Sequence, residues 1–192
     1  MSVREVATQA YREALPVLAV SAVGGLFAGL VLGGMRGDLR TVSGLLVLVP
    51  ALLATRGNVY GAMGAKLSTG LHQGLVEPKP IPDDRRIYTA VTAAMLNGVF
   101  ISVFAAGVAY GVLVAFARPA ASLVVLAAIA FVAGVLSGVA LTVIVVATVF
   151  AGYRRGLNPD TLVGPVVTTT GDVFGMAALL AAVRLVVALG GA

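Results

Sequence analysis

The stretch at residues 165–183, "PVVTTTGDVFGMAALLAAV", decides how this chain folds. It is strongly apolar and close to the roughly 20 residues that a helix needs to cross a bilayer. Asp172 lies near its middle. An acidic side chain at the centre of a membrane costs on the order of 3 kcal/mol or more, and such residues usually have a function. The stretch therefore predicts a membrane-spanning helix that carries a functional carboxylate.

The composition of the whole chain supports a membrane protein. Of 192 residues, 59% are hydrophobic and 11% are charged, whereas soluble domains carry about 25% charged residues. The mean hydropathy is +1.04. There is no cysteine, which excludes disulfides. The net charge of +5 comes mostly from basic residues at the ends of apolar segments, so we expect a lipid bilayer rather than a nucleic acid as the partner.

Five apolar segments are long enough to be membrane-spanning helices, and they cover residues 15–32, 41–71, 87–116, 121–153 and 162–189. Glycine- or proline-containing loops separate them, and Asn158-Pro159-Asp160 is a start signal for the last helix. We therefore expect an all-α integral membrane protein with a single domain over residues 1–192 and no cytosolic regulatory domain. The charged N-terminal stretch predicts a short interfacial helix that leads into the first span.

Basic residues predict the orientation. If the N-terminus is cytoplasmic, seven basic residues near helix ends are inside and three are outside. The inner set is Arg4, Arg12, Lys79, Arg85, Arg86, Arg154 and Arg155, and the outer set is Arg36, Arg40 and Arg118. This excess favours a cytoplasmic N-terminus in the cell membrane and an external C-terminus.

Each segment also contains glycines spaced by four, which allow helix backbones to approach closely in lipid. These sets are Gly25/Gly29/Gly33, Gly57/Gly61, Gly107/Gly111, Gly134/Gly138 and Gly171/Gly175. Their spacing predicts a tightly packed bundle.

Polar residues inside the membrane are concentrated on the second and fifth segments. Asp172 lies 11 residues beyond Thr161, or roughly 16 Å along the helix, which is near the middle of a ~30 Å core. Asn58 has a comparable depth, and Gly164, Thr168 and Asp172 share one helix face because they are spaced by four. Oxygen ligands of this kind suit Mg²⁺ or Ca²⁺ better than softer metals.

Other interpretations of the same residues stay open. Asp172 could form a structural ion pair with Arg56. The threonine hydroxyls could donate to the preceding helical turn, and Asn58 could simply bond to another helix. We expect no enzyme and no cofactor, because the chain has no Ser/His/Asp set and no metalloprotease motif.

Two stretches carry a resemblance to a known family. "VPALLATRGNVYGAMGAKLSTGL" at residues 49–71 resembles the second transmembrane helix of the MgtE-type magnesium transporters, and is closer still to their animal solute-carrier relatives. "LNPDTLVGPVVTTTGDVFG" at residues 157–175 resembles the start of the fifth helix of that family. The two motifs occur in the expected order and segments, and the resemblance covers the chain as the membrane domain of the family.

The resemblance implies a dimer in which the second and fifth helices line a central path for partly hydrated Mg²⁺. It assigns the pore aspartate to Asp172, the preceding pore positions to Thr168 and Gly164, and the Gly-Asn pair to Gly57 and Asn58. MgtE proteins often have asparagine at the position of Gly164, so that contact is absent here. Bacterial members also carry cytosolic magnesium-sensing domains, and the animal relatives fuse two membrane units.

We therefore expect a magnesium channel or facilitator, built as a homodimer or as a heterodimer with a similar chain. A magnesium exchanger coupled to sodium or protons is an alternative, with Asp172 as the protonation site. A second alternative is a membrane subunit that does not transport, in which Asp172 pairs with Arg56.

Overall fold

The computed structural model describes residues 3–77, 84–156 and 159–191. Two residues used in the predictions above, Lys79 and Asn158, lie outside these ranges. The described residues form helices α1 (Val3–Gly34), α2 (Arg36–Thr41), α3 (Leu45–His72), α4 (Arg85–Ala115), α5 (Leu123–Arg154) and α6 (Pro159–Ala188). The five long helices confirm the predicted all-α fold and its count of five long helices.

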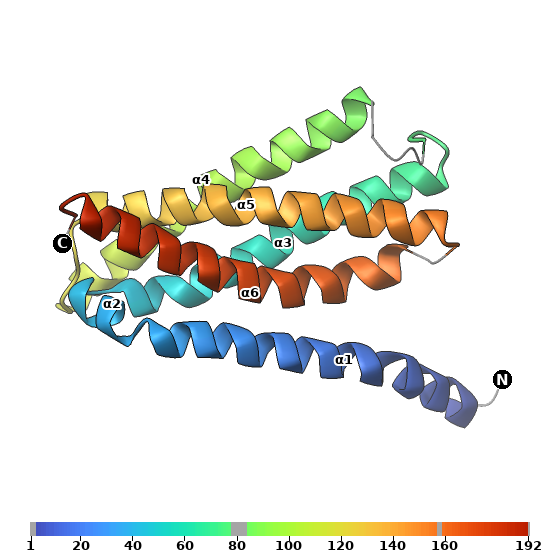
Figure 1. The fold of residues 1–192 in the computed structure, drawn as a ribbon, viewed down its shortest axis with the longest axis horizontal. Coiled ribbons are helices and arrows are strands. Elements are labelled where there is room, and N and C mark those ends of the chain that lie inside the picture. Colours follow the sequence, from blue (N-terminus) through green and yellow to red (C-terminus); the bar gives the residue numbers. More distant parts are fainter. Residues whose placement is uncertain (1–2, 78–83, 157–158, 192) are drawn as a thin grey trace.

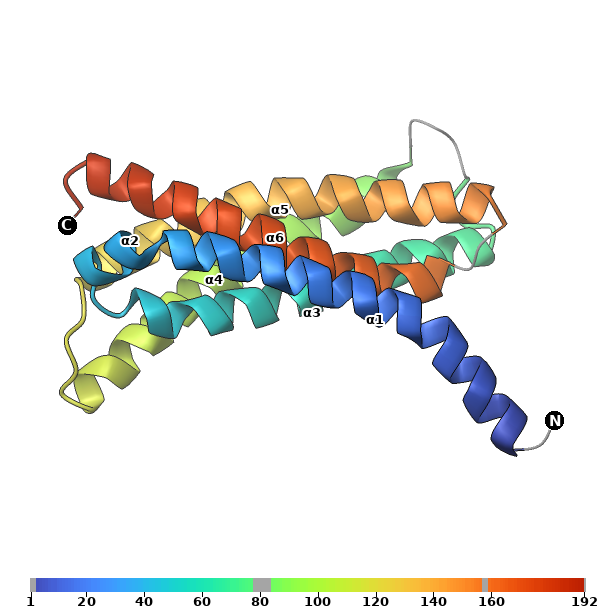
Figure 2. The same cartoon turned by 60° about the horizontal axis from the view of Figure 1, so that its bottom comes forward.

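The long helices form an antiparallel bundle (Figure 1). Helix α5 packs between α4 and α6, α3 packs against all three, and α1 packs against α6. Helices α3, α4, α5 and the Leu162–Ala188 part of α6 are each long and apolar enough to cross a membrane. The apolar part of α1, Leu18–Gly34, is shorter. The N-terminal part of α1 bends away from the bundle (Figure 2).

The bundle places the basic loops as the orientation argument requires. The N-terminal end of α1 lies at the same end of the bundle as the C-terminal ends of α3 and α5 and the N-terminal ends of α4 and α6, whereas α2 and the C-terminal end of α6 lie at the opposite end (Figure 1). The segments with the larger number of basic residues are therefore on one side. The assignment of that side to the cytoplasm stays a prediction.

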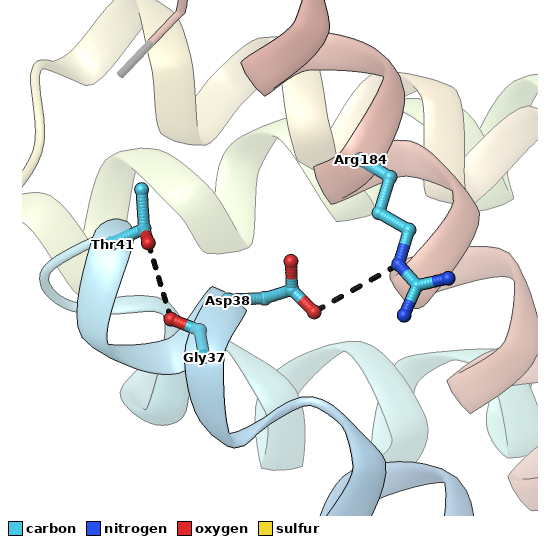
Figure 3. A network of polar contacts seen from close by, with 4 residues as sticks. All are labelled: Gly37, Asp38, Thr41 and Arg184. Carbon is cyan, nitrogen blue, oxygen red and sulfur yellow. Dashed lines mark hydrogen bonds and ion pairs between the residues drawn. The ribbon is translucent and has the colours of Figure 1, made fainter.

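The first two segments differ from the sequence predictions in three details. The N-terminal stretch is helical and leads into the first span, as predicted, but it is continuous with that span in α1 rather than a separate short helix. The polar connection after α1 contains the short helix α2, whose Asp38 contacts Arg184 of α6 at 4.0 Å (Figure 3). Helix α3 begins at Leu45 rather than at residue 41, because Gly44 has a positive φ of 90° that helix geometry does not allow.

Side-chain caps fix the starts of two long helices. The Asp84 carboxylate accepts a 2.8 Å hydrogen bond from the Arg86 amide at the start of α4. The Ser122 hydroxyl accepts one of 3.3 Å from the Val125 amide at the start of α5. Helix α6 begins at Pro159, a residue favoured at the first helical position because the amide it lacks would have no partner there.

The glycine prediction is only partly confirmed. A Cβ atom at Gly138 would lie 2.5 Å from the Tyr60 hydroxyl, and one at Gly175 would lie 2.8 Å from the Arg56 guanidinium. Close approach is therefore real in the sets on α5 and α6. At the glycines of the sets on α1, α3 and α4, an added Cβ atom would have no neighbouring atom within 4 Å, so these glycines do not mark close helix contacts within the chain. They are Gly25, Gly29, Gly33, Gly57, Gly61, Gly107 and Gly111.

Candidate functional site

The predicted polar face of α6 is present in the structure. Gly164 and Thr168 are exposed and Asp172 is half-buried. The Thr168 hydroxyl donates a 3.0 Å hydrogen bond to the Gly164 carbonyl. Its proton is therefore used within the helix, and its oxygen lone pairs remain free to accept a hydrogen bond from outside. This face offers a carboxylate and a hydroxyl oxygen one turn apart.

The other two threonines of the run do not belong to this face. Thr169 donates a 3.0 Å hydrogen bond to the Ser21 hydroxyl and so links α6 to α1. Thr170 donates to the Val166 carbonyl of the preceding turn. The alternative that the hydroxyls bond back to the helix is thus confirmed for Thr168 and Thr170, and Thr169 has a packing role.

Helix α3 presents an unusual exposed stripe. Beyond Val47, none of its large hydrophobic side chains is exposed. The stripe consists of small and polar residues: Pro50, Ala54, Asn58, Ala62, Ala65, Lys66 and Thr69. By contrast, α4 exposes Leu96, Phe100 and Phe104, as a surface in contact with lipid would. The exposed stripe of α3 therefore has the composition of a surface that faces water or protein.

Two contacts fix the level of α3 relative to α6. A Cβ atom at Gly175 would meet Arg56 and Leu53 of α3, and one at Gly64 would meet Val163 at 2.5 Å. The helices run antiparallel, so the level between these contacts can be interpolated from the helical rise. Asn58 then lies at the level of Asp172. The half-buried Gly57 lies beside it, between the exposed stripe and α6.

The Asp172 carboxylate forms no hydrogen bond or ion pair among the described residues, and in particular no ion pair with Arg56 within 4.0 Å. Arg56 is instead buried on the opposite side of α3 from Asn58, with 2% of its surface exposed. Among the described residues, no group of three or more His, Asp or Glu side chains could hold a metal ion. The described part of one chain thus contributes a single carboxylate, Asp172, at this level of the bundle.

Sequence reasoning missed one polar residue next to the site. Asn97 of α4, Asn58 and Lys66 line a groove of about 330 Å³ between α3 and α4. The signal was available, since Asn97 is an amide within an otherwise apolar helix. The amide carries no charge, so a search for ionisable groups within the apolar segments does not find it.

The fold and these residues define a class: an α-helical, multi-pass membrane protein with an acidic and an amide side chain near the middle of two neighbouring helices. Comparison with known proteins is more specific. Residues 49–182 match the MgtE family, which is described as a divalent cation transporter. The chain belongs to this family, as the resemblance of its second and fifth segments had indicated.

Two animal relatives are similar over most of the chain. Solute carrier family 41 member 3 of Rattus norvegicus is 26% identical over 171 residues, which are 86% of this chain and 36% of the rat protein. Solute carrier family 41 member 2 of Gallus gallus is 27% identical over 147 residues, or 73% of this chain and 25% of that protein. The chain thus spans about a third or less of the length of these relatives.

Proposed function

We propose that this protein carries Mg²⁺ across the membrane along a path lined by α3 and α6 of two copies of the chain. Asp172 from both copies holds the ion at the midplane, and the ion keeps most of its water. The observation that carries the proposal is the exposed small and polar stripe of α3 at the level of Asp172.

The donor chemistry suits a hydrated cation. Water bound to Mg²⁺ points its protons outward, so a site for the hydrated ion must offer hydrogen-bond acceptors. The Asp172 carboxylate, the Thr168 oxygen and the Asn58 amide oxygen are acceptors. Gly57 and Gly164 carry no side chain and leave room for the water shell. Contact through water also keeps binding weak enough for release.

Two copies are required because one chain supplies too little charge. A single Asp172 leaves a divalent ion half neutralised, whereas two carboxylates about a two-fold axis match its charge. The small and polar stripe of α3 supports the same arrangement, since a lipid-facing helix would expose large apolar residues there. A homodimer is the simplest assembly, and a heterodimer with a similar chain would serve equally.

The proposal is tested by magnesium uptake into liposomes that contain the purified protein and a trapped fluorescent magnesium indicator. We expect Asp172→Asn to abolish uptake, because the amide keeps the shape of the side chain and removes the charge. Asp38→Asn is the matched control, since Asp38 lies in α2 at one end of the bundle, and it should transport as the wild type does. Equal uptake by the wild type and by Asp172→Asn would refute the role of Asp172.

The same liposomes separate a channel from an exchanger. Uptake through a channel responds to the magnesium gradient and to voltage, whereas an exchanger also responds to an imposed sodium or proton gradient. The reading as a non-transporting subunit depended on an ion pair between Arg56 and Asp172, and the described structure has no such pair.

A further inference from the structure

Arg56 is the most unusual buried residue of the bundle. Only 2% of its surface is exposed, and all three guanidinium nitrogens lack a hydrogen-bond partner in the part of the chain that the structure describes. Its neighbours along α3, Leu52 and Tyr60, belong to two separate hydrophobic clusters, so Arg56 lies where the clusters meet. A buried cation without a partner is highly unfavourable, and an apolar residue of similar size would fit this place at lower free energy.

The position of the guanidinium relates it to the proposed ion path. Its terminal nitrogen lies 2.8 Å from where a Cβ atom of residue 175 would be, so the guanidinium packs directly against α6 at Gly175. Gly175 follows Asp172 by three residues, and positions with this spacing are neighbours on a helix surface. The positive charge thus lies about one helical turn beyond the carboxylate, on its C-terminal side.

We propose that Arg56 sets how tightly the path holds its cation. Its fixed charge repels an ion at Asp172 and so limits the residence time of that ion. In a two-fold assembly, two arginines would balance two aspartates, and the path would attract a divalent cation without trapping it. The repulsion is proportional to the charge of the ion, so it acts more strongly on divalent than on monovalent cations. This inference rests on the proposed function of Asp172.

The test compares the magnesium dependence of uptake into liposomes for the wild type, Arg56→Gln and Arg56→Lys. We expect Arg56→Gln to lower the half-saturating magnesium concentration at least about tenfold, and Arg56→Lys to retain the wild-type value because it keeps the charge. The control is Arg184→Gln, which removes a different, 64% exposed arginine of α6 and should leave the half-saturation unchanged. A second measurement is the rise in melting temperature with added Mg²⁺ in detergent, which reports binding without transport.

Each outcome decides the inference. If the wild type transports but Arg56→Gln has the same half-saturation, the role of Arg56 is refuted and the proposed function stands. If Arg56→Gln does not fold while Arg56→Lys does, Arg56 is a structural charge and the inference fails. If the wild type neither transports Mg²⁺ nor melts higher in its presence, both proposals fail. A lower half-saturation, together with a melting response at lower magnesium, supports the inference.

Discussion

The contact between Tyr60 and α5 gives a sharp test of how the bundle packs. The Tyr60 hydroxyl is buried, and a Cβ atom at Gly138 would lie only 2.5 Å from it. We expect Gly138→Ala to destabilise the protein by about 1–3 kcal/mol, the usual effect of overpacking. The helix propensity of alanine offsets this by up to about 1 kcal/mol. Among the described residues, the hydroxyl forms only a weak hydrogen bond to the Met95 sulfur, at 3.8 Å, so Tyr60→Phe should change stability by less than about 1 kcal/mol.

The double variant tests the cause. If the hydroxyl is the obstructing atom, Tyr60→Phe should recover at least about 1 kcal/mol in the Gly138→Ala background, as expected for residues in direct contact. Unfolding is best followed by circular dichroism in detergent, because the chain has no tryptophan. Gly29→Ala is the control for helix propensity alone, because a Cβ atom at Gly29 would have no neighbouring atom within 4 Å. Additive effects of the two substitutions would refute the predicted clash.

Three further predictions concern single residues. Thr169→Val removes the hydrogen bond to Ser21 and should lower the stability measured by circular dichroism by about 1 kcal/mol; an unchanged stability would contradict a packing role. Ala62→Cys on the α3 stripe should react with a charged thiol reagent at least about tenfold faster than Phe104→Cys, because a thiol in lipid does not ionise; equal rates would place both positions in the same environment. Asp38→Asn loses only a long, partly solvated ion pair with α6 and should change stability by less than about 1 kcal/mol in the same unfolding assay; a larger loss would mean that α2 anchors the bundle.

The long helices could be predicted because apolar runs and helix breakers bound them clearly. Pro159 begins α6 and Gly44 immediately precedes α3, as local chemistry requires. Helices α3 to α6 begin and end within four residues of the predicted bounds, whereas α1 begins 12 residues before its predicted start at residue 15. The short helix α2 was not predictable from hydropathy, because its six residues are polar. It is fixed instead by its own backbone and by its contact with α6.

The candidate site was predictable in composition but not in arrangement. The sequence alone indicated that Asp172 and Asn58 have similar depths, and the contacts of α3 with α6 place them level. It could not indicate which face of α3 is buried, because polar residues lie on both faces: Asn58 and Lys66 are exposed, whereas Arg56 and Ser68 are buried. An ion pair between Arg56 and Asp172 was therefore a reasonable interpretation of the sequence, whereas the fold buries Arg56 against Gly175. The hydrophobic periodicity of a single helix does not reveal such a contact, because the contact depends on how two helices cross.

The composition of α3 has a consequence for how the protein enters the membrane. Its mean hydropathy is 1.4, against 2.7 for α5, and it contains Arg56. An arginine at the centre of a helix costs about 3 kcal/mol during insertion, so α3 on its own is a weak insertion signal. Its neighbours α4, α5 and α6 all follow it in the chain. We expect a chain that ends after α3 to insert this segment poorly, and efficient insertion of such a truncated chain in a glycosylation-mapping assay would disprove this. If α3 does insert poorly on its own, it acquires its transmembrane position only after the later helices have been synthesised, as a property of the assembled bundle.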